Sequence, residues 1–407
     1  WSASVAAAQR LWVLGLLRDD EGLAEGKALS VVSPAVTHHS PAGIPIGSNT
    51  GRMFLAQPFW VRWRAPVPYP VYEITDPELR SYTILRHALT QPIRSWTSAN
   101  PSTLLATCRN LRRWWEDLSA DCADGSFCRG PAATLDASTR KRLAAGMQPK
   151  KLGPEPLPAK LWPLRILNCW KGGSAAFFLD RLPGAVGAEL PVREVGITAS
   201  EGFFAIPVDA GDPVAWLGGH VLEFVDDAGT PHFAWELLTG QEYRLVITTE
   251  AGLYRYDLED RVRVTGWMGP LPRLAFVGKS GNVLSATGEK LTEEQLALAC
   301  RQVFPGAVGA SATLGWGEVP WLRVAVEGAT ASPELLDAAL QQINVEYASK
   351  RETGRLGLPE LVPLAPGRIA AYKAARVAKG APEAQVKDPW ILNSESWQRL
   401  VEGEWSG

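Results

Sequence analysis

The sequence has no apolar run of the roughly 20 residues that a bilayer-spanning helix needs. It also lacks an excess of one charge, because 41 Lys and Arg face 43 Asp and Glu and the formal net charge is −2. This balance argues against nucleic-acid binding by bulk electrostatics. Residues 1–17 have neither a basic start nor a cleavage site, so they predict a helix and not a signal peptide. We expect a cytoplasmic protein with neither membrane nor nucleic acid as a partner.

Cysteine and histidine are scarce, with five of each. The cysteines are irregularly spaced and form no C-x-x-C, which argues against a zinc site and favours reduced thiols. No histidine stands in a Ser/His/Asp order or beside a G-x-S-x-G motif. Neither a phosphate loop of the G-x-x-x-x-G-K-[ST] type nor a dinucleotide fingerprint occurs.

Apolar residues make up 46% of the 407 residues and charged residues 21%, which excludes intrinsic disorder. The length is sufficient for a sizeable core, more readily in two domains than in one. The sequence starts at Trp1 and holds only three Met. Composition does not distinguish a processed N-terminus from a fragment.

The first segment predicts a helix followed by a strand. Residues 1–19 are expected to be helical, with Leu11, Leu14 and Leu17 on the apolar face. Residues 29–33 then predict a short buried strand that a proline stops.

A second helix is predicted to start at Asn100, which would be its N-cap, with Pro101 at the first helical position. Residues 146–163, rich in Pro, Gly and Lys, indicate a connector. From about residue 220 the hydrophobic period becomes two. Strands are expected at 220–225, 243–249, 253–256 and 261–265.

The last part of the sequence predicts a small separate α/β unit. Thr292 and Gln295 form a capping box before a helix. Residues 321–326 indicate a strand, and Ser332 with Pro333 would start another helix.

A hydroxyl-rich segment at 198–202, with the sequence T-A-S-E-G, is the first candidate site. The hydroxyls of Thr198 and Ser200 suit a phosphate, and the Glu201 carboxylate could hold Mg²⁺. An ordinary turn is the alternative.

The second candidate, Asp260, is expected at a strand end, where a carboxylate can accept hydrogen bonds from ribose hydroxyls. Its alternative is a surface Arg–Asp pair.

Two further segments carry lysines. The glycine-rich stretch 276–290 contains Lys279 and Lys290, and it could be a hinge beside a phosphate or a simple hairpin. Lys387 lies in a loop rich in Gly and Pro, from which a lysine could neutralise charge on a phosphate. The other basic residues of 350–387 predict a solvated face.

The order of these four elements resembles that of adenylate-forming enzymes. Within that superfamily, the sequence of the motifs resembles the auxin-responsive acyl-acid amido synthetases, the Gretchen Hagen 3 family. The resemblance extends over residues 29–390. The matching segments begin at Asn100, Thr198, Leu222, Gly240, Gly252, Val262 and Gly281.

The resemblance implies an α/β fold with a large multi-sheet adenylating domain, 1–278, and a smaller C-terminal α/β lid domain, 279–407. It implies that ATP and Mg²⁺ are cofactors. A small carboxylic acid would be activated as an acyl-adenylate and passed to an amine such as an amino acid. The sequence names neither the acid, nor the amine, nor the oligomeric state.

The resemblance also implies residue roles. Thr198 and Ser200 would line the α-phosphate, Glu201 would bind Mg²⁺ and Asp260 the ribose. Lys279 would take the place of an arginine that touches the nucleotide in many relatives.

Lys387 would be the catalytic lysine of adenylation. The segment 100–105, including Asn100 and Ser102, would wall the acyl pocket together with Trp96, and its apolar lining suits a hydrophobic acid.

Three departures from the family pattern leave alternatives open. The family has Gly-Asp where this sequence has Glu259-Asp260, and Pro-Arg where it has Pro389-Trp390. The family's phosphate loop lies upstream of the region matching residues 1–30, which predicts a preceding segment of ~100 residues that carries it. The alternatives are a thioester-forming coenzyme A ligase and a truncated, non-catalytic nucleotide-binding remnant.

Overall fold

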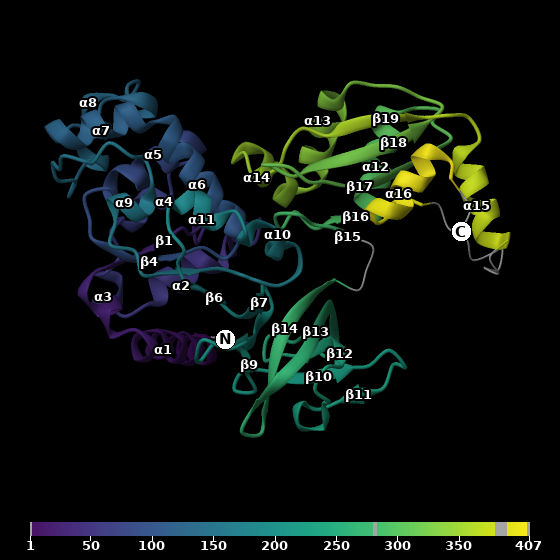
Figure 1. Ribbon diagram of the computed structural model, residues 1–407, viewed down its shortest axis with the longest axis horizontal. Helices are drawn as coiled ribbons and strands as arrows, with labels where there is room; N and C mark the ends of the chain where they lie inside the picture. Colours follow the sequence, from purple (N-terminus) through teal and green to yellow (C-terminus); the bar gives the residue numbers. More distant parts are fainter. Residues whose placement is uncertain (1, 280–282, 379–388, 405–407) are drawn as a thin grey trace. The chain divides into compact units, whose positions relative to one another are not determined.

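The computed structural model describes residues 2–279, 283–378 and 389–404. The chain forms two compact units, residues 1–280 and 281–407. The first unit holds a four-stranded and an eight-stranded sheet, and the second a three-stranded sheet (Figure 1). The α/β fold class with a large multi-sheet part and a smaller C-terminal part is confirmed.

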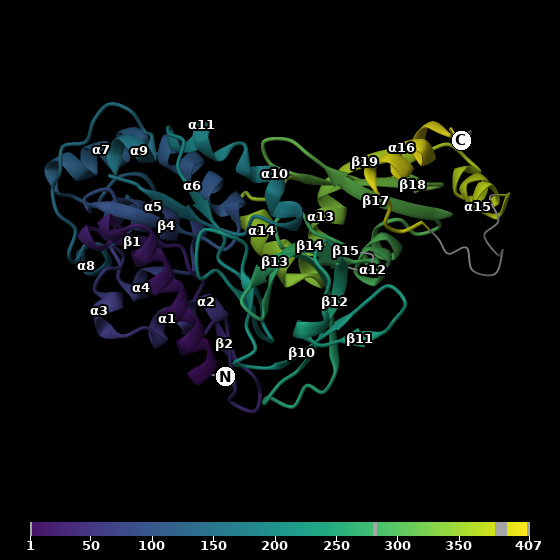
Figure 2. The same cartoon turned by 60° about the horizontal axis from the view of Figure 1, so that its bottom comes forward.

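The four-stranded sheet is parallel throughout. Its order is β1 (Lys27–Ser30), β4 (Ile93–Thr97), β5 (Ile166–Asn168) and β6 (Val192–Arg193). The view in Figure 2 shows this sheet between α1 (Ser2–Asp19) on one side and α6 (Pro101–Arg113) and α11 (Leu182–Val186) on the other. Helices on both faces leave the carboxyl ends of the strands as the edge where ligands bind in such folds.

Helix α1 forms as predicted, but only one of the three leucines expected on its apolar face, Leu17, is partly buried. Leu11 and Leu14 are 42% and 62% exposed, whereas Val5, Ala8 and Leu16 are buried. Apolar residues recur at helical spacing on both of these faces of α1, so the sequence pattern did not show which face is buried. Close approach to the rest of the unit buries the face that carries Ala8 and Gly15.

The close contact of α1 occurs at Gly15. A Cβ at this position would lie 2.4 Å from the carbonyl oxygen of Val208. Beside it, the buried Arg193 donates a hydrogen bond to the Asp19 carboxylate (2.7 Å). These contacts fix the C-terminal half of α1 against the chain that follows β6.

Helix α6 begins as predicted. The Asn100 side chain accepts a hydrogen bond from the Ser102 N–H (2.9 Å), and Pro101 is its first residue. The helix ends at Arg113, and after Trp114 the shorter α7 (Trp115–Asp124) begins.

The eight-stranded sheet is antiparallel. Its order is β11 (Pro231–His232), β10 (Val221–Val225), β12 (Glu242–Thr248), β13 (Tyr256–Met268), β14 (Leu271–Lys279), β9 (Val214–Ala215), β8 (Gly202–Ile206) and β7 (Ile197–Ala199).

Alternation along β12 is confirmed, because Tyr243, Leu245 and Ile247 are all buried in the core of this sheet. The separate strand expected at 253–256 was wrong. Leu253 lies in the turn before β13, and Arg255 has a φ of +46°, which is incompatible with an extended strand.

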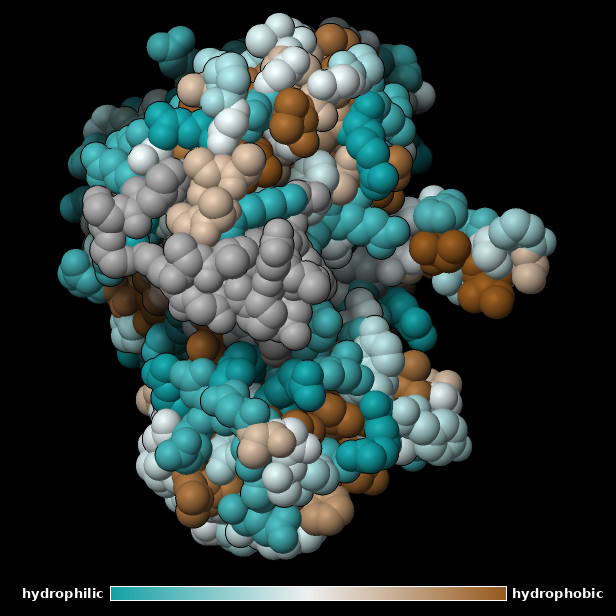
Figure 3. Space-filling model, turned by 90° about the vertical axis from the view of Figure 1, so that its right-hand side faces the viewer, coloured by the Kyte–Doolittle hydropathy of each residue, from teal (hydrophilic) through white to brown (hydrophobic). Residues whose placement is uncertain are grey.

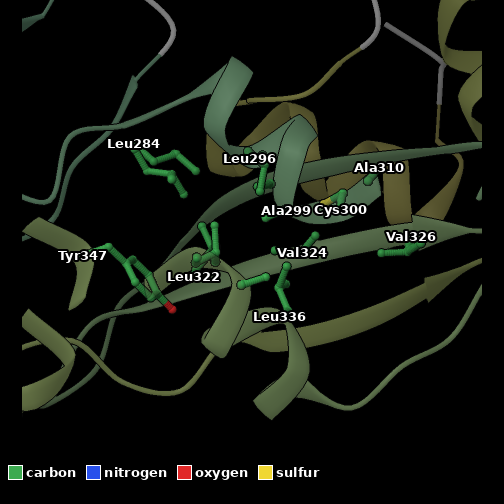
Figure 4. Close-up of a cluster of buried hydrophobic side chains, with 14 of the residues drawn as sticks. Leu284, Leu296, Ala299, Cys300, Ala310, Leu322, Val324, Val326, Leu336 and Tyr347 are labelled. Atoms are coloured by element: carbon green, nitrogen blue, oxygen red, sulfur yellow. The ribbon is translucent and has the colours of Figure 1, made fainter. Parts of the chain in front are cut away.

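The C-terminal unit is a sheet covered on both faces. Side chains from α12 and α13 meet one face, as Figure 4 shows for Leu296, Leu336 and Val324. Trp397 packs on the other face, near Ala325. Its elements are α12 (Glu293–Val303), β17 (Gly309–Gly315), β18 (Trp321–Glu327), α13 (Pro333–Ile343), α14 (Val345–Glu352), β19 (Glu360–Leu364), α15 (Arg368–Ala378) and α16 (Ser394–Glu402).

The capping box of α12 is confirmed, with Thr292 accepting from the Gln295 N–H. The sequence predicted one strand here and the sheet has three. The small residues of β17 and the proline in β19 gave no strand signal, and pairing with β18 makes both extended.

Short elements complete the fold. They are α2 (Asn49–Ala56), α3 (Phe59–Arg62), α4 (Tyr69–Tyr72), α5 (Pro77–Ala88), α8 (Ala137–Leu143), α9 (Pro158–Leu161), α10 (Ala176–Leu179), four 3₁₀ turns, and the pairs β2 (His38–His39) with β3 (Pro45–Ile46) and β15 (Val283–Leu284) with β16 (Leu291–Thr292).

The surface is mixed in character. On the face in Figure 3, hydrophobic side chains lie in small separate groups among hydrophilic ones, as is usual for a protein surface. No helix within the described ranges is long and apolar enough to cross a bilayer. All five cysteines are free thiols, and burial raises the pKa of Cys169 to about 12.

Candidate active site

The segment predicted to contact phosphate is the tip of a hairpin. Strands β7 and β8 pair between Ala199 and Gly202, which leaves Ser200 and Glu201 as a two-residue turn. Ser200 is exposed, and Thr198 and Glu201 are half-buried. A short turn between paired strands holds both side chains at a defined edge of the sheet.

Glu201 fits a role as a cation ligand. Its carboxylate has no hydrogen-bond or ion-pair partner among the described residues. No cluster of three acidic, His or Cys side chains occurs in that part of the chain either. Mg²⁺ is commonly held by one or two carboxylates together with substrate phosphates and water. A single unpartnered carboxylate beside hydroxyl groups therefore suits Mg²⁺ carried by a nucleotide.

Asp260 lies inside β13, so the expected position at a strand end was wrong. Its side chain is buried, with 7% exposure, and the strand register places Asp260 opposite Lys279 of β14. The alternative of an exposed Arg–Asp pair does not fit this burial. The nearby Arg255 pairs instead with Glu223, at 3.0 Å.

Glu259 explains how the strand accommodates Asp260. The pairing of β12 with β13 shifts register between Arg244 and Val246, and Glu259 has a φ of +57°. This is a β-bulge with one residue in the left-handed region, which glycine adopts most readily. A glycine, as expected from the family pattern, would adopt this φ without strain, and here Glu259 adopts it.

A loop that the sequence reasoning missed connects the parts of this region. After β5, the Trp170 N–H donates to the Ala99 carbonyl (2.8 Å) and its indole N–H to the Gly196 carbonyl (3.0 Å). A Cβ on Gly172 would lie 2.3 Å from the Phe276 carbonyl oxygen. The loop therefore joins the start of α6, the segment before β7, and β14. Two glycines after a buried strand were the available signal.

The residues expected in the acyl pocket are buried. Trp96 is fully buried and packs edge-to-face on Trp162, with 5.7 Å between ring centroids. Asn100 caps α6, and Ser102 is 3% exposed. The Ser102 hydroxyl and the side-chain amide oxygen Oδ1 of Asn168 have no hydrogen-bond partner in the described structure. Unsatisfied polar atoms thus occur at the carboxyl ends of β4 and β5.

A small cavity of about 150 Å³ adjoins the hairpin, since its lining includes Ile197, the residue before Thr198. Glu194 also lines it and accepts backbone N–H bonds from Lys171 (2.8 Å) and Val195 (2.9 Å). Burial raises the pKa of Glu194 despite these bonds. The lining residues are Lys171, Gly172, Glu194, Ile197, Asp212, Pro213, Leu274, Ala275 and Phe276.

Two further contacts of the hairpin were missed by sequence reasoning. The Asn49 side-chain N–H₂ donates to the Ser200 carbonyl (3.3 Å), and the ring of His220 lies against Gly202. Both residues are remote from the hairpin in sequence, and only folding brings them to it. Lys387 lies outside the described residues.

Comparison with known families decides what kind of chain this is. The GH3 family N-terminal domain matches residues 3–192, the central domain 219–279 and the C-terminal domain 323–396. The chain belongs to the GH3 family.

Named relatives of this GH3 chain include amide-forming enzymes. The jasmonoyl–L-amino acid synthetase JAR6 of Nicotiana attenuata is 29% identical over 53% of this chain and 42% of its own length. A human GH3 domain-containing protein is 25% identical over 81% of this chain and 66% of its own. The chain thus spans less than half the length of the Nicotiana relative.

The fold of this GH3 chain is that of a solved family member. The structure of the GH3.15 acyl acid amido synthetase superposes with a TM-score of 0.59, covering 97% of this chain and 76% of the other, at 18% identity. At this identity the likeness establishes the fold and nothing finer.

Proposed function

We propose that this GH3 protein is an ATP-dependent acyl-acid amido synthetase. The observation that carries the proposal is one sheet with an unpartnered Glu201 beside Ser200 at a hairpin tip and a buried Asp260 on another strand. The amide-forming names of its relatives support the same activity.

The chemistry has two steps. A carboxylic acid is a poor acylating agent because hydroxide leaves poorly. In the first step a carboxylate oxygen of the acid bonds to the α-phosphorus of ATP, and the bond to the departing pyrophosphate breaks. In the second step an amine nitrogen bonds to the acyl carbon, AMP leaves, and the nitrogen loses a proton. Both steps place extra negative charge on phosphate oxygens, which cations and hydrogen-bond donors stabilise.

The proposed residue roles follow the hairpin and β13. Thr198 and Ser200 donate to the α-phosphate, and Glu201 would hold Mg²⁺, which would supply positive charge against the phosphates. Asp260 accepts hydrogen bonds from the ribose hydroxyls. Lys279 contacts the nucleotide.

The acid and the amine complete the proposal. Lys387 stabilises phosphate charge during adenylation. Trp96, Asn100 and Ser102 lie behind the acyl site, which takes a hydrophobic acid, and the amine is an amino acid. Five free thiols support a cytoplasmic location.

An acid-dependent exchange assay tests the function. The chain is incubated with labelled pyrophosphate, ATP, Mg²⁺ and a panel of hydrophobic carboxylic acids, and label entering ATP is measured. We expect exchange that requires an acid, and an amide product when amino acids are added. A thioester with coenzyme A and no amide would contradict the amide reading. Nucleotide binding without any exchange would identify a non-catalytic protein.

A further inference from the structure

The glycine of the hairpin is required by space and not by backbone conformation. Gly202 is not among the glycines with positive φ. A Cβ built on it would lie 2.1 Å from Nε2 and 2.6 Å from Cδ2 of His220. Real Cβ atoms do not approach other atoms so closely, so the imidazole occupies the volume that any larger side chain at 202 would need.

His220 is held in this position by its surroundings. Its ring centroid lies 6.4 Å from that of Phe204, a fully buried residue of β8. The Nδ1 atom is buried and has no hydrogen-bond partner in the described structure. Burial lowers the pKa of His220, and the Glu250 carboxylate only partly opposes this. The ring is therefore neutral near pH 7 and acts by packing.

The Ser200–Glu201 turn has a second contact, at Ser200. Asn49, at the start of α2, donates to the Ser200 carbonyl, at 3.3 Å. The helix turn that carries this asparagine is closely packed, because a Cβ on Gly51, two residues later, would lie 2.4 Å from both Ala35 N and Ser33 O. Asn49 thus contacts the residue before Glu201, and His220 contacts the residue after it. Glu201 has no partner of its own, so these contacts set the position of the backbone from which its carboxylate extends.

We propose that His220 is a positioning residue that supports the Ser200–Glu201 turn through Gly202 and thereby fixes the Glu201 carboxylate for a nucleotide-bound divalent cation. This inference rests on the proposed function. The residue does not touch substrate, and it acts through the hairpin backbone.

A size-swap series tests the proposal. ATP binding to the full chain is measured by calorimetry at graded Mg²⁺ concentrations, which gives a half-saturating Mg²⁺ concentration for each variant. We expect Gly202→Ala to raise this concentration at least tenfold and His220→Ala to raise it several-fold. The double variant should regain most of the loss of Gly202→Ala, because removing the ring makes room for the new methyl group. His220→Phe, which keeps a flat ring, should stay close to wild type.

Controls separate positioning from general destabilisation. His38 is exposed, so His38→Ala should leave both the melting temperature and the Mg²⁺ dependence unchanged. Equal Mg²⁺ dependence in His220→Ala and His38→Ala would overturn the proposal, as would additive losses in the double variant. If His220→Ala does not fold, the comparison of Gly202→Ala with His220→Phe still decides, and equal Mg²⁺ dependence in these two variants would overturn the proposal. Absence of ATP binding by wild type would contradict the proposed function. If wild type binds ATP but the variants at Gly202 and His220 have an unchanged half-saturating Mg²⁺ concentration, only this inference is contradicted.

Discussion

At the scale of single residues, the site depends on two side chains in unusual positions. Asp260 is a buried acid within a long strand, and Glu259 beside it occupies the left-handed region. Burial makes a carboxylate costly unless it is hydrogen-bonded, and a non-glycine residue at positive φ is uncommon. Both features lie at the position proposed to bind the ribose.

Replacement of Asp260 should weaken nucleotide binding. Asp260→Ala removes the acceptor of the ribose hydroxyls, and we expect a loss of about 1–3 kcal/mol in ATP binding free energy. Calorimetric titration with ATP and with 2′,3′-dideoxy-ATP checks the reason. The difference between wild type and variant should disappear with the dideoxy nucleotide, and an equal loss for both nucleotides would show that Asp260 acts on something other than the ribose.

The bulge at Glu259 predicts opposite tolerance of two substitutions. Glu259→Gly keeps the left-handed conformation available, so its free energy of unfolding should stay within about 1 kcal/mol of wild type. Glu259→Val places a β-branched residue at positive φ and should lose about 1–3 kcal/mol. Urea unfolding measures both. A valine variant as stable as the glycine variant would show that the bulge is not retained in solution.

At the scale of elements, docking depends on where a backbone can approach its neighbour. Helix α1 buries Val5, Ala8 and Leu16 and leaves Leu11 and Leu14 exposed, because Gly15 must meet the Val208 carbonyl closely. The loop after β5 uses Gly172 in the same way against β14. Small residues at such points matter more than the apolar stripes that periodicity detects.

Substitutions in α1 check which face is buried. Gly15→Ala gains about 1 kcal/mol of helix propensity, but its methyl group would press on a backbone carbonyl, a strain of about 1–3 kcal/mol. Since a carbonyl cannot rotate away, we expect net destabilisation. Leu14→Ala, on the exposed face, should change stability by no more than about 0.5 kcal/mol. Thermal and urea unfolding would contradict this assignment if the leucine variant were the less stable one.

At the scale of the whole molecule, the chain consists of two compact units that meet in sequence after Ser280. Each unit has its own core, around Leu245 in the first and Leu322 in the second. The proposed nucleotide residues belong to the first unit, and Lys387 belongs to the second in sequence.

Removal of Lys387 should separate binding from chemistry. Lys387→Ala deletes a cation proposed to act on phosphate charge, while the nucleotide contacts of the first unit are unaffected. We expect acid-dependent pyrophosphate exchange to be abolished and ATP affinity to stay within a few-fold, measured by exchange and calorimetry. Lys373→Ala, on α15, is the matched control and should retain exchange. Unchanged exchange in the Lys387 variant would show that the lysine is misassigned.

The sequence by itself determined the features that depend on near neighbours. The cap at Asn100, the capping box at Thr292 and the alternation of β12 are local, because the interacting groups lie within a few residues. The order of motifs also indicated the family and the α/β class. Such features can be read along the chain without knowing which distant segments meet.

The tertiary structure alone decided which surfaces and side chains meet. It selected the buried face of α1, placed Asp260 inside β13, and brought Asn49 and His220 to the Ser200–Glu201 turn. These outcomes depend on contacts between segments far apart in sequence and on the space left between backbones. Local propensity carries no information about that space, so the support of the candidate site could be found only in the folded chain.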